Sequence, residues 1–196
     1  MTSFALDLHL TLPDWAAAHL ATLPGQFPDP EARMALILDL ARRNFEQDTG
    51  GPFAAGVFER DGGRLVAIGV NRVVASGCSS AHAEVMALGL AQKRLGSYDL
   101  GGPGLPDHEL VVNWRPCAMC YGALLWSGVR QLTIPGSGPE LEELTGFDEG
   151  PVHPEWREQL ARRGIATRDQ VLRAEAVELF RHFQRSARVV YNPRQG

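Results

Sequence analysis

The chain has 196 residues, of which 44% are hydrophobic and 21% charged, and this predicts one domain with a full core. Its formal net charge of −4 argues against a general nucleic-acid binder, because affinity for phosphates comes mainly from Lys and Arg. An odd count of three cysteines argues against a disulfide framework, and no apolar run reaches the roughly 20 residues that span a bilayer. The beginning of the chain lacks the pattern of a signal peptide. We therefore expect a cytoplasmic protein with reduced thiols and no membrane contact.

The start of the chain is predicted to form an extension that packs on the domain. Residues 4–12 alternate apolar and other side chains, and this period of two favours an extended segment with one buried face. A short helix is expected over 14–23, followed by a Pro/Gly-rich joint at 24–30. The extension therefore covers residues 1–29.

A helix, a hairpin and a loop are predicted next. Apolar side chains recur at helical spacing over residues 31–47. Two β-prone runs, 53–60 and 64–70, are joined by the tripeptide Asp-Gly-Gly, which is a strong hairpin signal. Residues 71–81 are expected to be a loop.

Helices and strands then alternate along the rest of the chain. The expected elements are helices at 83–95, 116–127, 155–163 and 173–188 and strands at 109–113, 129–134 and 165–168. Strands separated by helices favour one mixed sheet covered on both faces. The predicted fold class is α/β, a three-layer α/β/α sandwich with a central mixed sheet, in a single domain covering 1–196.

Two short motifs, each at the start of a predicted helix, carry metal-ligating side chains. Cys117 and Cys120 lie three residues apart, so both sulfurs fall on the same side of a first helical turn. The positive end of the helix dipole favours thiolates there. His82 adds a third ligand from the other helix start, which leaves the fourth tetrahedral position for the water that a catalytic zinc requires. We predict one Zn²⁺ per chain at these three residues.

Glu84, two residues beyond His82, is the predicted proton carrier. Residues two apart point to different sides of a regular helix, so both can approach the metal only from the helix's first turn. Glu84 would then take a proton from the water and deliver it to the substrate ring and the leaving group. Ala83, between them, is small enough to let the substrate approach the backbone.

A closed structural metal site is the alternative interpretation. Cys78 lies four residues before His82 and could complete a set of three cysteines and one histidine. Such a site would leave no position for water and no role for Glu84. The chain would then be a zinc-stabilised binding module without activity.

The chain resembles the cytidine-deaminase superfamily over about residues 30–192, and within it the bacterial guanine deaminases. The pair of metal motifs is the signature of zinc nucleobase deaminases. The further matching segments are Gly51-Pro52-Phe53, Asn71, Gly122-Ala123 with Trp126, Gly146-Phe147-Asp148-Glu149, and Tyr191-Asn192-Pro193-Arg194. One position departs from the pattern, because Arg115 stands directly before the Pro-Cys pair where most relatives have an acidic residue.

The resemblance implies a cytidine-deaminase-like fold, a homodimer, and hydrolysis of guanine to xanthine and ammonia. Amino-triazines such as ammeline are further implied substrates. Asn71 would hydrogen-bond the base, and Phe53 and Trp126 would line a flat slot alongside His82. From the residues alone, Asn in a turn usually serves the backbone, and aromatic side chains usually belong to the core.

The resemblance also implies roles for the acidic segment and the end of the chain. Glu149 would be a second proton carrier, and Asp148 would lie beside it at the substrate. Residues 189–196, including Tyr191, would form a C-terminal flap over the pocket. The ordinary alternatives are a solvated acidic loop and a frayed chain end.

Two other substrate classes remain open from the sequence. A tRNA adenosine deaminase shares the zinc motifs but needs a basic surface to hold RNA. The pairs Arg42-Arg43 and Arg162-Arg163 lie beside acids on predicted helix faces, so we do not expect a nucleic-acid partner. A cytosine or nucleoside deaminase is the remaining alternative.

Overall fold

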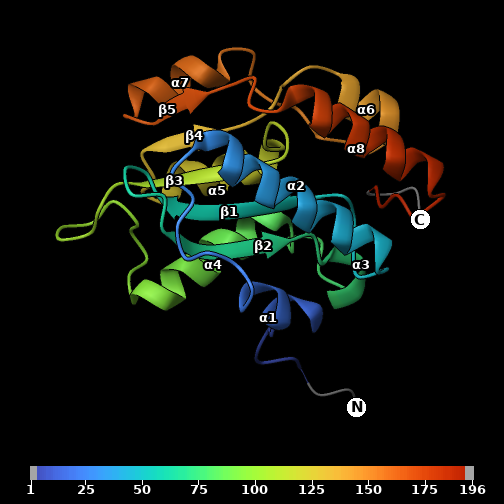
Figure 1. Cartoon of the computed structure of the whole chain (residues 1–196), viewed down its shortest axis with the longest axis horizontal. Coiled ribbons are helices and arrows are strands. Elements are labelled where there is room, and N and C mark those ends of the chain that lie inside the picture. Colours follow the sequence, from blue (N-terminus) through green and yellow to red (C-terminus); the bar gives the residue numbers. More distant parts are fainter. Residues whose placement is uncertain (1–3, 193–196) are drawn as a thin grey trace.

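The computed structural model describes residues 4–192 (Figure 1). Its helices are α1 (Trp15–Leu20), α2 (Pro30–Glu46), α3 (Val73–Ser76), α4 (Ala83–Leu95), α5 (Ala118–Trp126), α6 (Glu140–Thr145), α7 (Trp156–Arg162) and α8 (Arg173–Arg185). Its strands are β1 (Ala54–Glu59), β2 (Leu65–Val70), β3 (His108–Val112), β4 (Gln131–Thr133) and β5 (Ala166–Arg168).

The five strands form one mixed sheet in the order β2-β1-β3-β4-β5. β1 runs antiparallel to both β2 and β3, whereas β3, β4 and β5 are parallel to one another. Since β2 and β3 both oppose β1, they point the same way, and their carboxyl ends lie at the same edge of the sheet. The loops that follow these two strands therefore meet there.

Two separate apolar clusters cover the two faces of the sheet, which confirms the predicted three-layer α/β/α fold. One cluster packs α2 and α8 against the sheet through side chains such as Ile37, Phe45 and Phe180. The other packs α4, α5 and α7 against the opposite face through side chains such as Leu88 and Leu124. Figure 1 shows α2 on one face of the sheet with α4 and α5 on the other.

α4 packs closely against β2, and Gly69 makes this possible. A Cβ atom at Gly69 would lie 2.1 Å from the carbonyl oxygen of Ala83 and 2.4 Å from the nitrogen of Ala87. Any side chain at this position would therefore push the first turn of α4 away from the sheet. That first turn follows His82 directly, so the glycine also fixes how near His82 lies to the sheet edge.

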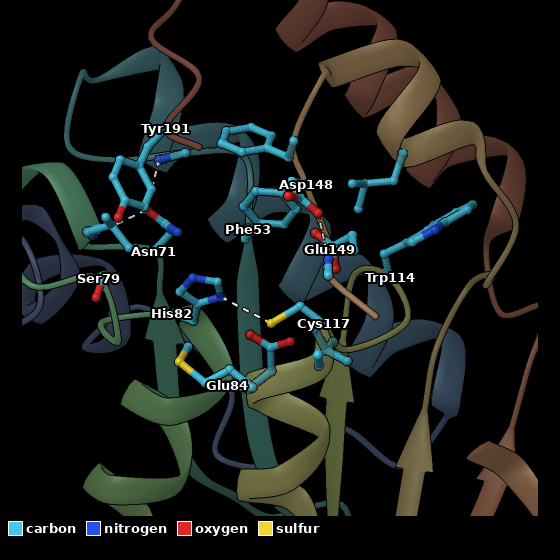
Figure 2. Close-up of a pocket in the computed structure, with 18 of the residues that line it drawn as sticks. Phe53, Asn71, Ser79, His82, Glu84, Trp114, Cys117, Asp148, Glu149 and Tyr191 are labelled. Atoms are coloured by element: carbon cyan, nitrogen blue, oxygen red, sulfur yellow. Dashed lines mark hydrogen bonds between the residues drawn. The ribbon is translucent and has the colours of Figure 1, made fainter. Parts of the chain in front are cut away.

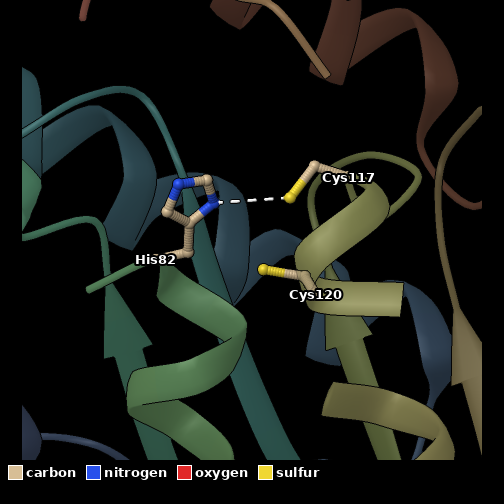
Figure 3. A group of neighbouring side chains, drawn as sticks. All are labelled: His82, Cys117 and Cys120. Atoms are coloured by element: carbon tan, nitrogen blue, oxygen red, sulfur yellow. Dashed lines mark hydrogen bonds between the residues drawn. The ribbon is translucent and has the colours of Figure 1, made fainter. Parts of the chain in front are cut away.

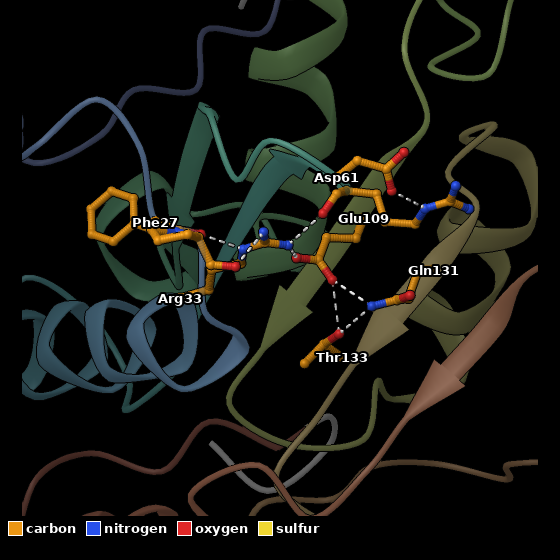
Figure 4. Close-up of polar contacts among 8 residues, drawn as sticks. Phe27, Arg33, Asp61, Glu109, Gln131 and Thr133 are labelled. Atoms are coloured by element: carbon orange, nitrogen blue, oxygen red, sulfur yellow. Dashed lines mark hydrogen bonds and ion pairs between the residues drawn. The ribbon is translucent and has the colours of Figure 1, made fainter.

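Arg33 and Glu109 form a buried ion pair that fixes the start of α2 to β3 (Figure 4). Arg33 also donates from Nε to the carbonyl oxygen of Phe27 at 2.7 Å. The second carboxylate oxygen of Glu109 accepts from Gln131 Nε2 at 2.7 Å and from Thr133 Oγ1 at 2.9 Å. Because both charges are fully paired, removal of either one would cost about 3–5 kcal/mol of stability.

The prediction for residues 4–12 is wrong. No strand forms there, and the side chains of Phe4 and Leu6 are 92% and 94% exposed. The alternation is present, but Phe4, Leu6 and Leu8 are exposed, and Leu12 at the end of the series packs partly against the cluster beneath α2. Residues 13–29 do pack on the domain, where Ala16 and Phe27 are buried in the cluster beneath α2.

Two short helices were not predicted. α3 lies within the stretch 71–81 that was expected to be a loop, and α6 precedes the acidic segment. Helices of four and six residues complete too few turns to produce a readable apolar period. Among the described residues, no helix is long and apolar enough to cross a membrane.

Candidate active site

The starts of α4 and α5 bring three metal-ligating side chains together (Figure 3). His82 is the N-cap residue of α4, Cys117 is the N-cap residue of α5, and Cys120 lies in the first turn of α5. Their ligand atoms all lie within 4.8 Å of one another, and His82 Nδ1 is 3.6 Å from Cys117 Sγ. Two helices that follow β2 and β3 thus converge at the sheet edge where those strands end.

The first turn of α5 stabilises a thiolate. The pKa of Cys117 is lowered to about 4, because the Cys120 thiol hydrogen-bonds to it and His82 lies beside it. The pKa of Cys120 is raised, since this thiol keeps the proton that it shares with Cys117. A metal cation replaces such a shared proton and allows both sulfurs to ionise.

The donor set fits zinc. Two thiolates and one imidazole are soft or borderline ligands of the kind that Zn²⁺ prefers, and three protein ligands leave one position open. Cys78 is outside this group: its thiol lies 3.2 Å from Ser80 Oγ in the loop between α3 and α4. The closed site that would include Cys78 is therefore not formed.

Glu84 lies beside the metal-ligating group, in the first turn of α4 (Figure 2). Its carboxyl group is buried, and burial raises its pKa, with a further contribution from the charge of Cys117. His82 and Glu84 therefore share a first helical turn, as the spacing required. A carboxyl group with a raised pKa can both accept and return a proton near neutral pH.

A pocket of about 340 Å³ opens onto this group of side chains (Figure 2). Its walls come from the segment before β1, the end of β2, the starts of α4 and α5, the acidic segment after α6, and the C-terminal segment. The predicted site residues that line it are Phe53, Asn71, His82, Glu84, Cys117, Asp148, Glu149 and Tyr191. Six separate parts of the chain thus supply the wall.

Asn71 is held so that its amide nitrogen remains for a ligand. Its Oδ1 accepts hydrogen bonds from the backbone nitrogens of Gly51 at 3.4 Å and Val73 at 3.3 Å. Its own backbone nitrogen donates to the carbonyl oxygen of Phe53 at 3.0 Å. With the oxygen committed, the Nδ2 group is a donor suited to a carbonyl or ring nitrogen of a base.

Glu149 lies in the wall on the far side of Cys117 from Glu84 in the view of Figure 2. Its side chain is buried, and burial raises its pKa to about 9, with smaller contributions from the charges of Cys117 and Glu84. Arg115 acts in the opposite direction, because a nearby positive charge favours the ionised form. The buried surroundings of Glu149 therefore favour its protonated form.

The loop that carries Glu149 is anchored at both ends. The Phe147 ring packs edge-on against Phe53, with centroids 4.9 Å apart, and the Glu149 carbonyl oxygen accepts from the nitrogen of Ala118 at 3.0 Å. The Asp148 carboxylate accepts from the nitrogen of Gly150 at 2.8 Å and so closes the turn. Both residues line the pocket, but Asp148 is exposed and closes the turn, whereas the Glu149 side chain is buried in the wall.

Trp126 does not lie in the pocket, contrary to the expectation that it lines the slot. It is the last residue of α5, and its side chain is 87% exposed. Nine residues of helix carry it away from the first turn, which holds the metal ligands. Ala83 is fully buried against the sheet and is also outside the pocket lining.

The C-terminal segment covers the pocket in part. Tyr191 lines the pocket, and Asn192 Oδ1 accepts from the nitrogen of Asp148 at 2.9 Å while its Nδ2 donates to the carbonyl oxygen of Gly146 at 2.8 Å. Residues 193–196 of the expected flap, including Pro193 and Arg194, lie outside the described residues. Asn192 thus ties the described part of this segment to the acidic loop.

Several lining residues were not predicted. They include Val74, Ser79, Trp114, Met119 and Leu141. Met119 lies between the two cysteines of the second metal motif and Trp114 lies three residues before it, and this proximity could have identified them. The others come from α6 and from the region around α3, where no element or only a loop was expected.

Comparison with known proteins identifies the family. Residues 28–135, more than half of the chain, match the cytidine and deoxycytidylate deaminase zinc-binding region. The guanine deaminase of Bacillus subtilis is 35% identical over 116 residues, which cover 59% of this chain and 69% of that protein. The chain therefore belongs to the cytidine and deoxycytidylate deaminase family, and it is a zinc-dependent hydrolytic deaminase.

Two solved structures extend the likeness to nearly the whole chain. A guanine deaminase from Nitrosomonas europaea is 44% identical, with a TM-score of 0.87, and the match covers 94% of this chain and all of that one. A protein solved in complex with 2,6-diaminopurine is 46% identical, with a TM-score of 0.87, and the match covers 96% of this chain and 98% of that one.

Proposed function

We propose that this protein hydrolyses guanine to xanthine and ammonia, with amino-triazines such as ammeline as further substrates. One observation carries the proposal: a single pocket joins the metal-ligating group and Glu84 to Asn71 and to a second buried carboxyl group, Glu149. The similarity to guanine deaminases over nearly the whole chain supports the same substrate.

The residues divide the proton transfers between them. His82, Cys117 and Cys120 would hold the zinc, which when bound would activate a water near neutral pH. Glu84 takes a proton from this water and returns it to a ring nitrogen of the base. Asn71 donates a hydrogen bond from Nδ2 to an acceptor on the base and fixes its orientation.

Glu149 completes the reaction on the amine side. The amine of guanine is bonded to a carbon between two ring nitrogens, and it must leave as neutral ammonia. Because burial favours the protonated Glu149 carboxyl, it can give its proton to the departing amine, and it is reprotonated by the proton that the new hydroxyl group on that carbon loses as the carbonyl forms. Water adds to the carbon, the bond from that carbon to the amine breaks, and the products are xanthine and ammonia.

A tRNA substrate is less well supported. Arg42 and Arg43 both pair with Asp39, and Arg42 pairs also with Glu46, so this basic pair is neutralised on the surface of α2. The formal net charge of the chain is −4. Neither feature suits a protein that must neutralise RNA phosphates.

Ammonia release from a panel of substrates tests the proposal. We expect turnover of guanine, slower turnover of ammeline, and little or none of cytosine or adenosine. The same preparation should not convert adenosine in a tRNA anticodon stem-loop to inosine. Efficient tRNA editing without ammonia from guanine would overturn the assignment. Glu84→Gln protein with full zinc content is the control for contaminating deaminases.

We also propose a homodimer in the cytoplasm. Trp126 and Met119 expose apolar surface on α5, as expected of a face that a second copy covers. All three cysteines are free thiols, which suits a reducing compartment. Light scattering should give a molar mass twice that of one chain. The Trp126→Ser substitution should lower the measured mass toward that of one chain.

A further inference from the structure

Asn44, which does not line the pocket, clamps the two segments that form the base-binding wall. It lies in the last turn of α2 and is fully buried. Its Nδ2 group donates to the carbonyl oxygen of Gly51 and to the carbonyl oxygen of Asn71, each at 2.9 Å. Gly51 precedes β1 and Asn71 follows β2, so one amide group joins the chain on both sides of the hairpin.

The backbone at Gly50 lies so close to Asn71 and Asn44 that these residues have little freedom to move. A Cβ atom at Gly50 would lie 1.9 Å from the carbonyl oxygen of Asn71 and 2.6 Å from Asn44 Nδ2. Only glycine allows the two segments to meet at this distance. The position of the Asn71 backbone, and hence of its side chain in the pocket, therefore depends on the Asn44 amide.

Thr49 fixes the rotation of the Asn44 amide. Its hydroxyl group is 2.8 Å from Asn44 Oδ1 and 3.0 Å from the Asn44 carbonyl oxygen. With the oxygen engaged by Thr49, the amide nitrogen must face Gly51 and Asn71. Trp15 Nε1 in turn donates to Thr49 Oγ1 at 3.1 Å, so α1 contacts the same group.

Arg72 adds a second link from the chain's N-terminal region to this group. Its Nη1 donates to the carbonyl oxygen of Thr49 at 2.6 Å, and its Nε donates to the carbonyl oxygen of Thr11 at 3.1 Å. The extension before α2 therefore contacts the residues that hold Asn71, although none of its residues lines the pocket.

We infer that Asn44, oriented by Thr49, is a positioning residue for substrate binding, and that the N-terminal extension acts on the base-binding wall through this pair. The inference rests on the proposed function, because it takes Asn71 to be the residue that contacts the base. Asn44 acts through Asn71 and makes no contact with the substrate itself.

A double-mutant cycle between Asn44 and Asn71 tests the inference. Asn44→Asp keeps the size and the acceptor for Thr49 but removes both donated hydrogen bonds. In the zinc-loaded full chain we expect KM for guanine to rise about tenfold, as for one misplaced hydrogen bond, with kcat changed less than twofold. In an Asn71→Ala background the same substitution should change KM less than twofold, because the residue it positions is absent.

Asn113→Asp is the matched control. Asn113 is equally buried, and it joins the carbonyl oxygen of Pro52 and the nitrogen of Ala54 without a hydrogen bond to Asn71. Its effect on KM should be the same with and without Asn71→Ala.

If Asn44→Asp fails to fold, Thr49→Val replaces it in the cycle, with an expected rise in KM of about threefold.

The outcomes separate this inference from the proposed function. An unchanged KM in the Asn44 or Thr49 variant, or an equal rise in both backgrounds, overturns the positioning role while Asn71 remains a base contact. A single variant Asn71→Ala with wild-type KM for guanine overturns the role of Asn71 in the proposed function itself. Zinc content and melting temperature, measured for each variant, show that the pocket is otherwise intact.

Discussion

The two ends of the pocket are built in different ways. The metal end comes from the first turns of α4 and α5, where local helix geometry places His82, Cys117 and Cys120. The base end comes from loops, where Asn71 and Glu149 are held by contacts with residues far away in the sequence. Functional residues at helix starts can therefore be predicted from their spacing in the sequence. The positions of functional residues on loops depend instead on tertiary contacts with other parts of the chain.

Loss of a metal ligand should have the largest effect. Cys120→Ser replaces a soft thiolate with a neutral hydroxyl, so we expect loss of bound zinc and of all measurable turnover. Cys78→Ser should keep one zinc per chain and full activity. Metal analysis by mass spectrometry together with ammonia release measures both. Loss of zinc from the Cys78 variant would contradict the three-ligand site.

Glu84→Gln should affect turnover nearly as strongly while leaving the metal in place. The amide keeps the shape of the side chain but cannot accept a proton, and a positioned acid–base group contributes about 10²- to 10⁴-fold. We therefore expect kcat to fall by that factor with zinc content unchanged. Turnover near that of the wild type would remove Glu84 from the mechanism.

At the base end, Glu149→Gln and Asp148→Asn should differ clearly. Both residues line the pocket, but the Glu149 side chain is buried in its wall, whereas Asp148 is exposed and its carboxylate closes its own turn. We expect kcat to fall about 10²-fold or more for Glu149→Gln and less than tenfold for Asp148→Asn. Steady-state kinetics with guanine, at equal zinc content, distinguishes them. Equal and mild effects would mean that the loop is an ordinary solvated turn.

The Glu149 carboxyl group should also make the stability of the protein depend on pH. The pKa of Glu149 is about 9 in the fold and near 4.3 in an unfolded chain. A raised pKa gives stability that is complete below pH 4 and is lost as pH rises toward 9. The melting temperature should therefore fall less between pH 5 and 9 for Glu149→Gln than for the wild type. Parallel curves would show that Glu149 is already ionised.

The smallest effects should come from the aromatic side chains, and they should differ between pocket and surface. Phe53 lines the pocket and packs against Phe147, so Phe53→Leu should raise KM for guanine roughly 2- to 10-fold. Trp126→Ser should leave KM of the zinc-loaded enzyme within twofold. A larger rise for the Trp126 variant would mean that this side chain reaches a substrate site in a partner copy.

The sequence predicted the metal end of the pocket better than the base end. The three metal ligands, and the placement of Glu84 beside them, followed from spacing and helix signals alone. Asn71, Glu149 and Tyr191 were identified by family resemblance, because a residue in a loop has no periodic pattern that indicates its direction. Their roles stay predictions until the variants are measured.

The sequence-based predictions that were wrong or missing also failed because they depended on tertiary contacts. Alternation in residues 4–12 indicates which side chains share a face but not whether another surface covers that face. Trp126 lies close in sequence to the metal motif, yet the length of α5 carries it to the surface. Asn44 gave no signal at all, because its importance arises from two carbonyl groups that only the folded hairpin brings together.

The two apolar clusters on opposite faces of the sheet have a consequence for how this enzyme can change over time. α4 and α5, which hold the metal, belong to one layer, whereas Asn44 on α2 and the Phe183 side chain of α8 that packs against Phe147 belong to the other. Substitutions in the second layer can shift the base-binding wall without disturbing the zinc ligands. A lineage could thus acquire new substrates by drift in one layer while the hydrolytic machinery in the other stayed constant.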